Sequence, residues 1–220
     1  MKEKHIQIRI EQCLALAKAS PCPRRKLAAL LLDPKRNVIL MDGYNGGPRG
    51  GKGILCGGTF CHREGLKQED VEITQGRDKR GASEVKVRVN GSVVWSTPIL
   101  ATDSWGVEPS AKEMAEAWVQ EMLEKYPGVK SGTHMEVGCH HAEMNVICNA
   151  AANGVSCSGA WMICLAEPCM MCAKMIHHAG IAHLIVVDGG YLGGKEGLQY
   201  LRDHGIKVTE VEGPKDPRLS

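Results

Sequence analysis

The sequence has no stretch of about 20 consecutive apolar residues, the length that a membrane-spanning helix needs. Its first residues also lack the apolar run of a secretory signal peptide. These two absences argue against a membrane protein and against a secreted one. We therefore expect a cytoplasmic protein whose thiols are kept reduced.

Aromatic residues and net charge are scarce as well. The chain has one Phe, four Tyr and four Trp, and its formal net charge is +2. Nucleic-acid-binding proteins usually carry a basic patch, and those that bind single strands add aromatic rings on which bases stack. The basic residues here are scattered, so binding to nucleic acid is not expected.

Cysteine, by contrast, is abundant, with ten residues in a chain of 220. Without a secretion signal, metal binding, catalysis or buried free thiols explain these residues better than disulfides do. The length and the 43% content of hydrophobic residues suit one domain with a sizeable core. We accordingly treat residues 1–220 as a single domain and look for a metal site.

Apolar periodicity and turn residues predict an alternation of helices and strands. Strands separated by helices of this length imply an α/β domain whose sheet is at least partly parallel. The expected helices cover residues 5–19, 110–126, 141–153, 168–179 and 195–204, and the expected strands cover 26–33, 37–42, 160–165, 182–188 and 206–211.

Two further segments interrupt this alternation. Residues 43–51 are too rich in glycine for regular structure and are expected to form a functional loop. Residues 62–133 are more polar, and we interpret them as an insertion. Within it, 85–95 reads as a hairpin around Asn-Gly, and Ser110 reads as the cap of a helix whose apolar stripe is a packing surface.

Two short motifs begin two of the expected helices, with one expected strand between them. They are His-Ala-Glu at 141–143 and Pro-Cys-Met-Met-Cys at 168–172. Cys169 and Cys172 can turn both sulfurs toward one point, where the positive end of the helix dipole favours thiolates. Pro168 is expected in the first helical turn, where its missing N–H is not needed.

One histidine and two cysteines suit Zn²⁺ and leave its fourth tetrahedral position for water, as in catalytic zinc sites. Zinc can bring the pKa of that water to about 7. Glu143, two residues after His141, is a candidate proton shuttle. Alone, the first motif could be an exposed polar turn and the second a redox thiol pair or half of a structural zinc site. Together they indicate a catalytic zinc held by His141, Cys169 and Cys172.

In this order the motifs resemble the H-x-E…P-C-x-x-C signature of the cytidine deaminase superfamily. The resemblance implies a three-layer α/β fold: a central mixed sheet of about five strands flanked by helices, with a long insertion before the catalytic histidine. It also implies that a zinc-activated hydroxide attacks C4 of cytosine. Glu143 would then take the water proton, protonate the ring nitrogen and deliver a proton to departing ammonia.

Residues 20–32 and 43–50 resemble the deoxycytidylate deaminases within that superfamily. The resemblance covers roughly residues 10–60 and 138–211. It implies deamination of dCMP to dUMP, which supplies dUMP for thymidylate synthesis, and it implies a homo-oligomer, often a hexamer. Regulation by a nucleoside triphosphate is known in the family and stays open for this chain.

The same resemblance implies the substrate contacts. Asn45 would bind the sugar, because its amide offers both a donor and an acceptor; the alternative is that Asn45 belongs only to a turn. Ala29 would approach the base, and Tyr191 lies in a downstream segment that the resemblance includes. The family usually has glycine-alanine where this chain has alanine twice, at 28–29, which would slightly alter the approach to the base.

An arginine fork matches phosphate oxygens, so the 5′-phosphate would meet Arg24, Arg25 or Arg49. Of the three, we expect Arg25 to contact the phosphate. The alternative is that all three arginines are solvated surface residues.

Several remaining cysteines lie in regions where some deoxycytidylate deaminases hold a second, structural zinc. Cys22, Cys56 and Cys139 would supply three ligands, and His134 or Cys61 would complete the tetrahedron. The alternative is that these are free thiols. The other cysteines, which look like small core residues, are Cys13, Cys148, Cys157 and Cys164.

Two competing functions stay open. The first is deamination of another cytosine nucleotide, such as dCTP or a 5-modified dCMP. The second, from another class, is a zinc-stabilised nucleotide-binding protein that has lost turnover. Glu143 argues against the second, because a purely structural site has no use for a carboxylate at that position.

Overall fold

The computed structural model describes residues 1–47, 59–61, 63–99, 109–128, 139–187 and 194–212. The chain forms two compact units: Met1–Arg49 with Cys139–Ser220, and Gly50–Gly138. We call them the five-stranded unit and the three-stranded unit. The expected insertion at 62–133 lies inside the second range, and its boundaries and the single-domain assignment stay predictions.

The five-stranded unit is built on one mixed sheet. Its order is β2-β1-β6-β7-β8, with β1 antiparallel to both neighbours and β6, β7 and β8 parallel to one another. A partly parallel sheet of five strands was expected and is confirmed. The strands are β1 (Ala28–Asp33), β2 (Val38–Tyr44), β6 (Trp161–Cys164), β7 (His183–Val187) and β8 (Lys207–Val211).

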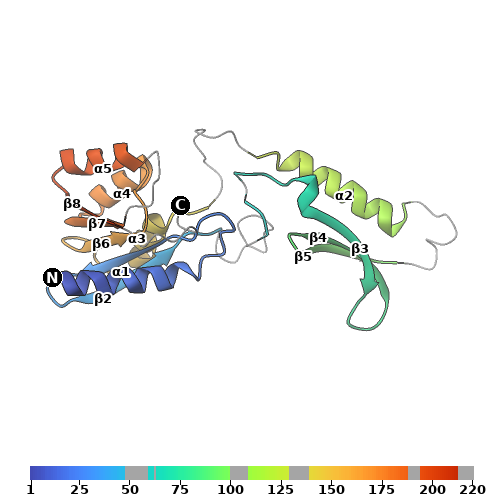
Figure 1. The fold of residues 1–220 in the computed structure, drawn as a ribbon, viewed down its shortest axis with the longest axis horizontal. Helices are drawn as coiled ribbons and strands as arrows, with labels where there is room; N and C mark the ends of the chain where they lie inside the picture. Colours follow the sequence, from blue (N-terminus) through green and yellow to red (C-terminus); the bar gives the residue numbers. More distant parts are fainter. Residues whose placement is uncertain (48–58, 62, 100–108, 129–138, 188–193, 213–220) are drawn as a thin grey trace. The chain divides into compact units, whose positions relative to one another are not determined.

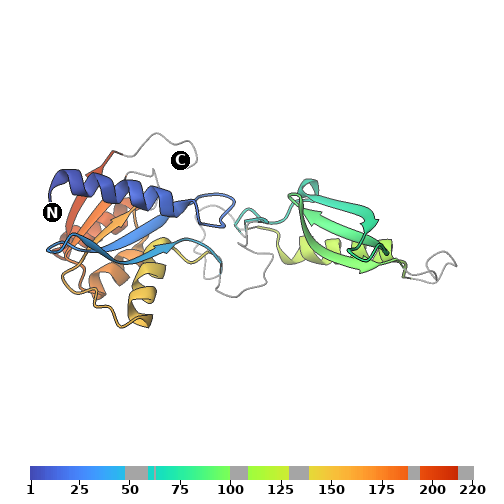
Figure 2. The ribbon, with the colours of Figure 1, turned by 90° about the horizontal axis from the view of Figure 1, so that it is seen from below.

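Helices cover both faces of this sheet, so the unit has three layers (Figure 1 and Figure 2). Side chains alternate along β1: Leu30 packs toward one helix, and Leu31 packs among three others. The single helix is α1 (Glu3–Ala17), and the other three are α3 (Ala142–Ala152), α4 (Met170–His178) and α5 (Gly194–Asp203). The three-layer α/β fold predicted from the sequence is therefore confirmed.

Two local predictions about element boundaries were wrong. Pro168 is not in the first turn of α4, because Cys169 has the extended backbone of a helix cap, with φ −65° and ψ 165°, and the helix begins at Met170. Gly43 and Tyr44 belong to β2 and not to the glycine-rich loop, because both pair with residues of β1.

The three-stranded unit is an antiparallel sheet in the order β3-β4-β5 with one helix. The hairpin between β4 (Ser83–Val89) and β5 (Ser92–Pro98) turns at Asn90 and Gly91, which have φ of 48° and 80°. It was predicted, whereas β3 (Val71–Arg77) was not. The short 3-10 helix η1 (Gln68–Asp70) precedes β3.

Helix α2 (Ala111–Lys125) starts at the predicted cap, where Ser110 and Glu113 form a capping box. It packs against β4 in an apolar cluster that includes Val85, Val87 and Trp118. The expectation that its apolar stripe serves packing is thus confirmed.

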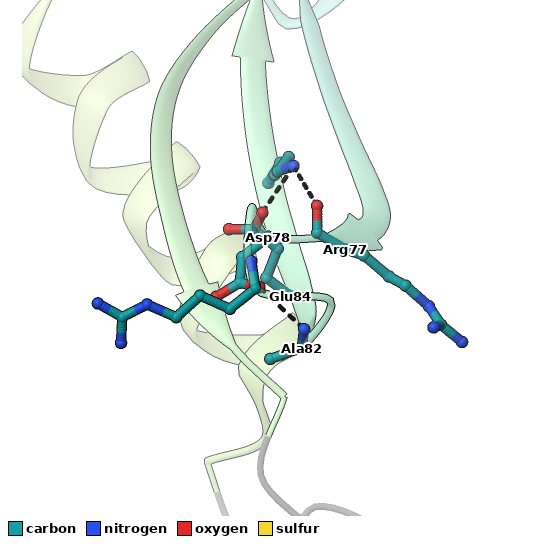
Figure 3. Close-up of polar contacts among 6 residues, drawn as sticks. Arg77, Asp78, Ala82 and Glu84 are labelled. Carbon is teal, nitrogen blue, oxygen red and sulfur yellow. Dashed lines mark hydrogen bonds and ion pairs between the residues drawn. The ribbon is translucent and has the colours of Figure 1, made fainter.

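The turn between β3 and β4 is held by polar contacts (Figure 3). The carboxylate of Asp78 accepts hydrogen bonds of 2.8 Å from the backbone N–H groups of Arg80 and Ala82. Nearby, the ammonium of Lys86 lies 2.6 Å from the carboxylate of Glu84 and 3.1 Å from the backbone oxygen of Arg77. These polar groups therefore satisfy one another within the turn.

The cysteines expected in the core do not all lie there. Cys13 and Cys164 are buried, but Cys148 is exposed and Cys157 is half-buried. Cys148 lies on the exposed side of α3, whereas Val146 and Ala150, two residues before and after it, face the core.

None of the helices in the described ranges combines the length and the apolar character that crossing a bilayer requires.

Candidate active site

His141, Cys169 and Cys172 form the one group of three metal-capable side chains found in the described part of the chain. Their ligand atoms all lie within 4.8 Å of one another. The Nδ1 atom of His141 is 3.5 Å from each of the two Sγ atoms. The structure therefore brings together three residues that are up to 31 positions apart in the chain.

Two helix N-termini create this cluster. His141 is the N-cap residue of α3, Cys169 is the N-cap residue of α4, and Cys172 lies in the first turn of α4. Both helices pack on the same face of the sheet through apolar residues such as Val146 and Ile176. The positive dipole ends of both helices thus lie at the cluster, and the backbone N–H of Cys172 donates to the sulfur of Cys169, which favours the thiolate form of Cys169.

The spacing of the three atoms fits a zinc ion. Zinc bonds of about 2.3 Å to sulfur and about 2.1 Å to nitrogen, at a tetrahedral angle, place those two atoms about 3.6 Å apart. The observed separation of 3.5 Å matches that value for both pairs. One neutral imidazole and two thiolates are also a donor set that zinc commonly takes.

The two thiols differ in acidity because they share a hydrogen bond. The pKa of Cys169 is lowered to about 3, first by the hydrogen bond from Cys172 and then, against the effect of burial, by His141. The pKa of Cys172 is raised by that same hydrogen bond, by burial and by the charge of Glu143. The shared hydrogen bond therefore favours the thiolate on Cys169 and the thiol on Cys172.

Glu143 lies one residue into α3, beside the cluster. It is buried, with 8% of its surface exposed. Burial raises the pKa of its carboxyl group, and the nearby His141 opposes that rise. A carboxyl group held beside a metal site is suited to proton transfer.

Two glycines of α5 allow the helix to pack closely against the turn that carries Cys169. A Cβ atom on Gly197 would lie 2.2 Å from the backbone oxygen of Pro168, and one on Gly194 would lie 2.1 Å from the Cβ of Glu167. The backbone of α5 therefore lies directly against the turn that carries Cys169. This contact was not predicted from the sequence, in which the Gly-x-x-Gly spacing at 194–197 was the available signal.

Asn45 is buried and its side chain is already engaged. The side-chain oxygen accepts hydrogen bonds from the Ser20 hydroxyl at 2.7 Å and from the Leu27 N–H at 2.8 Å. Its amide nitrogen donates to the backbone oxygen of Arg25 at 2.8 Å. The same amide also donates to the sulfur of Cys22 and helps to lower the pKa of that thiol. The residue thus ties the segment after α1 to the end of β2.

The other expected substrate contacts have different locations. Ala29 is fully buried on β1, in the same apolar cluster as Ala142 and Val146 of α3. Arg25 is half-buried, and its backbone N–H lies 3.4 Å from the sulfur of Cys22. Tyr191 and Arg49 lie outside the described residues.

Part of the expected second metal site is described. The thiol of Cys139 donates a hydrogen bond to Cys22 and, with backbone N–H groups, lowers the pKa of Cys22 to about 5. Cys22 and Cys139 therefore lie together, as a shared site would need. Cys56 and His134 fall outside the described residues, and Cys61 belongs to the three-stranded unit.

A backbone bridge connects the glycine-rich loop with the metal cluster. Gly46 and His140 exchange two hydrogen bonds, of 2.8 Å and 3.2 Å, in an isolated antiparallel bridge. His140 directly precedes His141. The loop after β2 is therefore tied to the chain at the cap of α3.

Relatives with known names share parts of this chain. It is 43% identical over 72 residues to the deoxycytidylate deaminases of enterobacteria phages T2 and T4, a match that covers 32% of this chain. The match spans only 38% and 37% of those two proteins, well under two thirds of their length.

A solved structure has the same fold. The dCMP deaminase of cyanophage S-TIM5, in complex with dCMP and dUMP, aligns with 96% of this chain and 99% of its own at a TM-score of 0.54 and 18% identity. At that identity the likeness supports the fold alone.

The family model described as the cytidine and deoxycytidylate deaminase zinc-binding region matches residues 3–188. This range includes both motifs and most of the five-stranded unit. The chain therefore belongs to the cytidine and deoxycytidylate deaminase family.

Proposed function

We propose that this chain catalyses the zinc-dependent hydrolysis of dCMP to dUMP and ammonia. The observation that carries the proposal is the buried carboxyl group of Glu143 beside three ligand atoms at zinc spacing. Membership of the family supports the reaction type. The two phage relatives, which are named deoxycytidylate deaminases, support the choice of nucleotide.

His141, Cys169 and Cys172 would hold the zinc ion. Zinc bound there supplies a water molecule that can attack C4 of the cytosine ring near neutral pH. Three ligands from the chain are the number found in catalytic sites, whereas structural sites usually use four.

Glu143 would move the protons. Its carboxylate takes a proton from the attacking water and passes it to ring nitrogen N3, while the new C4–O bond forms. It then carries the second water proton to the exocyclic amine, the C4–N bond breaks, and ammonia leaves. The balance is dCMP plus water giving dUMP plus ammonia, with Glu143 returned to its starting state.

Asn45 would contact the deoxyribose through its side-chain amide, which bonds the Arg25 oxygen and the Cys22 sulfur and would share one of these donors with the sugar. Arg25 would face the 5′-phosphate, and Tyr191 and Ala29 would line the base and sugar region. The existing hydrogen bonds of Asn45 support a pre-organised loop, which lowers the ordering cost of binding.

A substrate panel tests this function. The purified protein is incubated separately with dCMP, dCTP, deoxycytidine and 5-methyl-dCMP, and ammonia release and ultraviolet absorbance are followed. Highest kcat/KM with dCMP supports the proposal. Preference for dCTP or 5-methyl-dCMP would show that this nucleotide is the substrate. No turnover on any of the four would favour the alternative function, a zinc-stabilised nucleotide-binding protein that has lost catalysis.

A second, structural zinc site is part of the proposal. It is supported by the contact between the Cys22 and Cys139 thiols, and Cys56 and His134 would complete it. Metal analysis of the purified protein separates the outcomes: two zinc ions per chain support the site, and one removes it. Cys22→Ser should then lower the count by one while turnover is measured on the same sample.

Two expectations about assembly remain predictions. A homo-oligomer, which the resemblance implies is often a hexamer, is tested by sedimentation of the purified protein. A nucleoside triphosphate effector is tested by adding the common nucleoside triphosphates one at a time during dCMP turnover and measuring KM.

A further inference from the structure

Helix α3 and the edge strand β2 are joined by two asparagine side chains. The amide nitrogen of Asn145 donates to the backbone oxygen of Tyr44 at 2.7 Å, and that of Asn149 donates to the backbone oxygen of Asp42 at 2.8 Å. The donors are one helical turn apart, and the acceptors are alternate residues of the strand. The two bonds therefore fix the position of α3 along β2 and not only its distance from it.

Gly43 lies between the two acceptors and makes this contact possible. A Cβ atom there would lie 2.7 Å from the backbone nitrogen of Val146 and 3.1 Å from the backbone oxygen of Ala142. The backbones of the helix and the strand thus touch directly. Asn145, Asn149 and Gly43 form what we call the α3–β2 clamp.

The clamp joins two parts of the candidate site. Helix α3 begins at Ala142, directly after His141, and carries Glu143 in its first turn. Strand β2 ends at Tyr44 and leads into Asn45, whose backbone N–H also bonds the Leu27 oxygen at 3.0 Å. The clamp therefore sets the distance between the proton-transferring carboxyl group and the loop proposed to meet the sugar.

The third asparagine in the same row behaves differently. Asn153 is four residues beyond Asn149, but its amide donates to the backbone oxygen of Asn149, within its own helix, at 2.8 Å. Asparagine at this spacing does not by itself make a cross-element contact. Asn153 is accordingly a matched control.

We propose that Asn145 and Asn149 are positioning residues that align the loop beginning at Asn45 with Glu143, so that a bound cytosine nucleotide presents its C4 atom for reaction. The proposal rests on the function proposed above. In this proposal neither asparagine contacts the substrate, and both act through the backbone of β2. A misplacement of about 1 Å between reacting groups can cost about 100-fold in rate, so small displacements of the loop would be visible in kinetics.

The test compares Asn145→Ala/Asn149→Ala with Asn153→Ala. We expect the double variant to lose about 10-fold to 100-fold in kcat/KM for dCMP, with a raised KM, while zinc content stays at the wild-type value. Amide hydrogen exchange across residues 42–46 should become faster by about 10-fold, because the strand loses its tie to α3. Asn153→Ala should change neither quantity by more than about twofold.

A second variant separates hydrogen bonding from packing. Asn145→Asp keeps the side-chain size, but a carboxylate cannot donate to the Tyr44 oxygen. It should reproduce the faster exchange, and it also serves if the double variant does not fold. Either wild-type kcat/KM or wild-type exchange at 42–46, in Asn145→Asp or in the double variant, would overturn the proposal.

The two proposals fail in different ways. If the wild-type protein turns over none of the four nucleotides, the proposed function is wrong. The exchange comparison needs no substrate, and unchanged exchange at 42–46 would overturn the clamp alone.

Discussion

The side-chain oxygen of Asn45 accepts a 2.7 Å hydrogen bond from the hydroxyl of Ser20, and both residues are buried. The same hydroxyl lies 2.7 Å from the backbone oxygen of Asn45 and accepts a hydrogen bond from the Cys22 N–H at 3.2 Å. One buried hydroxyl therefore organises the passage from α1 to β1 around the end of β2.

Replacing Ser20 by alanine should lower the free energy of unfolding by about 1–3 kcal/mol, because the Cys22 N–H and the Asn45 oxygens lose a buried partner. Urea unfolding measures this change. The control is Ser158→Ala, an exposed position that should change stability by less than about 0.5 kcal/mol. Equal stability of the two variants would show that the Ser20 hydroxyl contributes nothing to the fold.

Glu143→Gln should separate catalysis from stability. The amide keeps the size of the side chain but cannot transfer protons, so kcat should fall by about 10³-fold or more. Burial already disfavours the charged carboxylate, so unfolding free energy should be unchanged or higher.

The measurements are dCMP turnover, metal content and urea unfolding on one preparation. Cys172→Ala is the comparison, since it removes a ligand and should lose both zinc and turnover. Turnover by Glu143→Gln within tenfold of wild type would exclude the proton-transfer role.

Apolar periodicity and glycine stops allowed the helices and strands of the five-stranded unit and its partly parallel sheet to be predicted. Gly154 and Gly180, for example, have φ of 66° and 72° just after α3 and α4. The three layers of this unit were expected from the family resemblance. Strand β3 was not predicted, because its burial does not alternate and Gly76 weakens its pattern. Local signals thus work where one face is consistently buried.

The metal cluster could be predicted only because two motifs together matched a known signature. The contacts around it could not. The acceptor of Asn145 is a backbone oxygen 101 residues away, and nothing in the sequence marks a backbone atom as a partner. Likewise, the contact between Gly197 and Pro168 depends on how α5 returns to the sheet. Such contacts follow from tertiary packing and not from local pattern.

Gly197→Ala should reverse the usual effect of this substitution. Alanine normally stabilises a helix by about 1 kcal/mol relative to glycine. Here the new Cβ would lie 2.2 Å from the Pro168 oxygen and 3.4 Å from the carbonyl carbon of Cys169. We expect a loss of about 1–3 kcal/mol in unfolding free energy and faster zinc transfer to a chelator, because the Cys169 turn is displaced.

The matched control is Glu196→Ala, an exposed position on the same helix. It should leave zinc transfer at the wild-type rate. If Gly197→Ala releases zinc no faster than this control, α5 does not position the Cys169 turn.

His183 should make stability depend on pH. The residue is buried on β7, and its Nε2 lies 2.9 Å from the Thr209 hydroxyl. Its ring packs edge-to-face against Trp161, with the two ring centroids 4.5 Å apart. Its Nδ1 has no hydrogen-bond partner in the described part of the chain. Burial, then the charges of Lys207 and the N-terminus, lower the pKa of His183 from 6.5 to about 4.

In the unfolded chain His183 gains its proton near pH 6.5, whereas the folded protein resists protonation until about pH 4. The unfolded state therefore binds more protons in this window, and stability falls as the pH falls through it. Above about pH 6.5 the contribution is fully present. It amounts to at most about 3 kcal/mol between the two limits.

Loss of zinc at low pH would lower stability as well, so the comparison must be made against His183→Gln. Urea unfolding of both proteins is measured from pH 7 to pH 4.5, with zinc content checked at each pH. The difference in slope between them isolates the histidine, because the thiols of Cys169 and Cys172 are common to both. Parallel curves would mean that His183 takes up its proton in the folded state as readily as in the unfolded one.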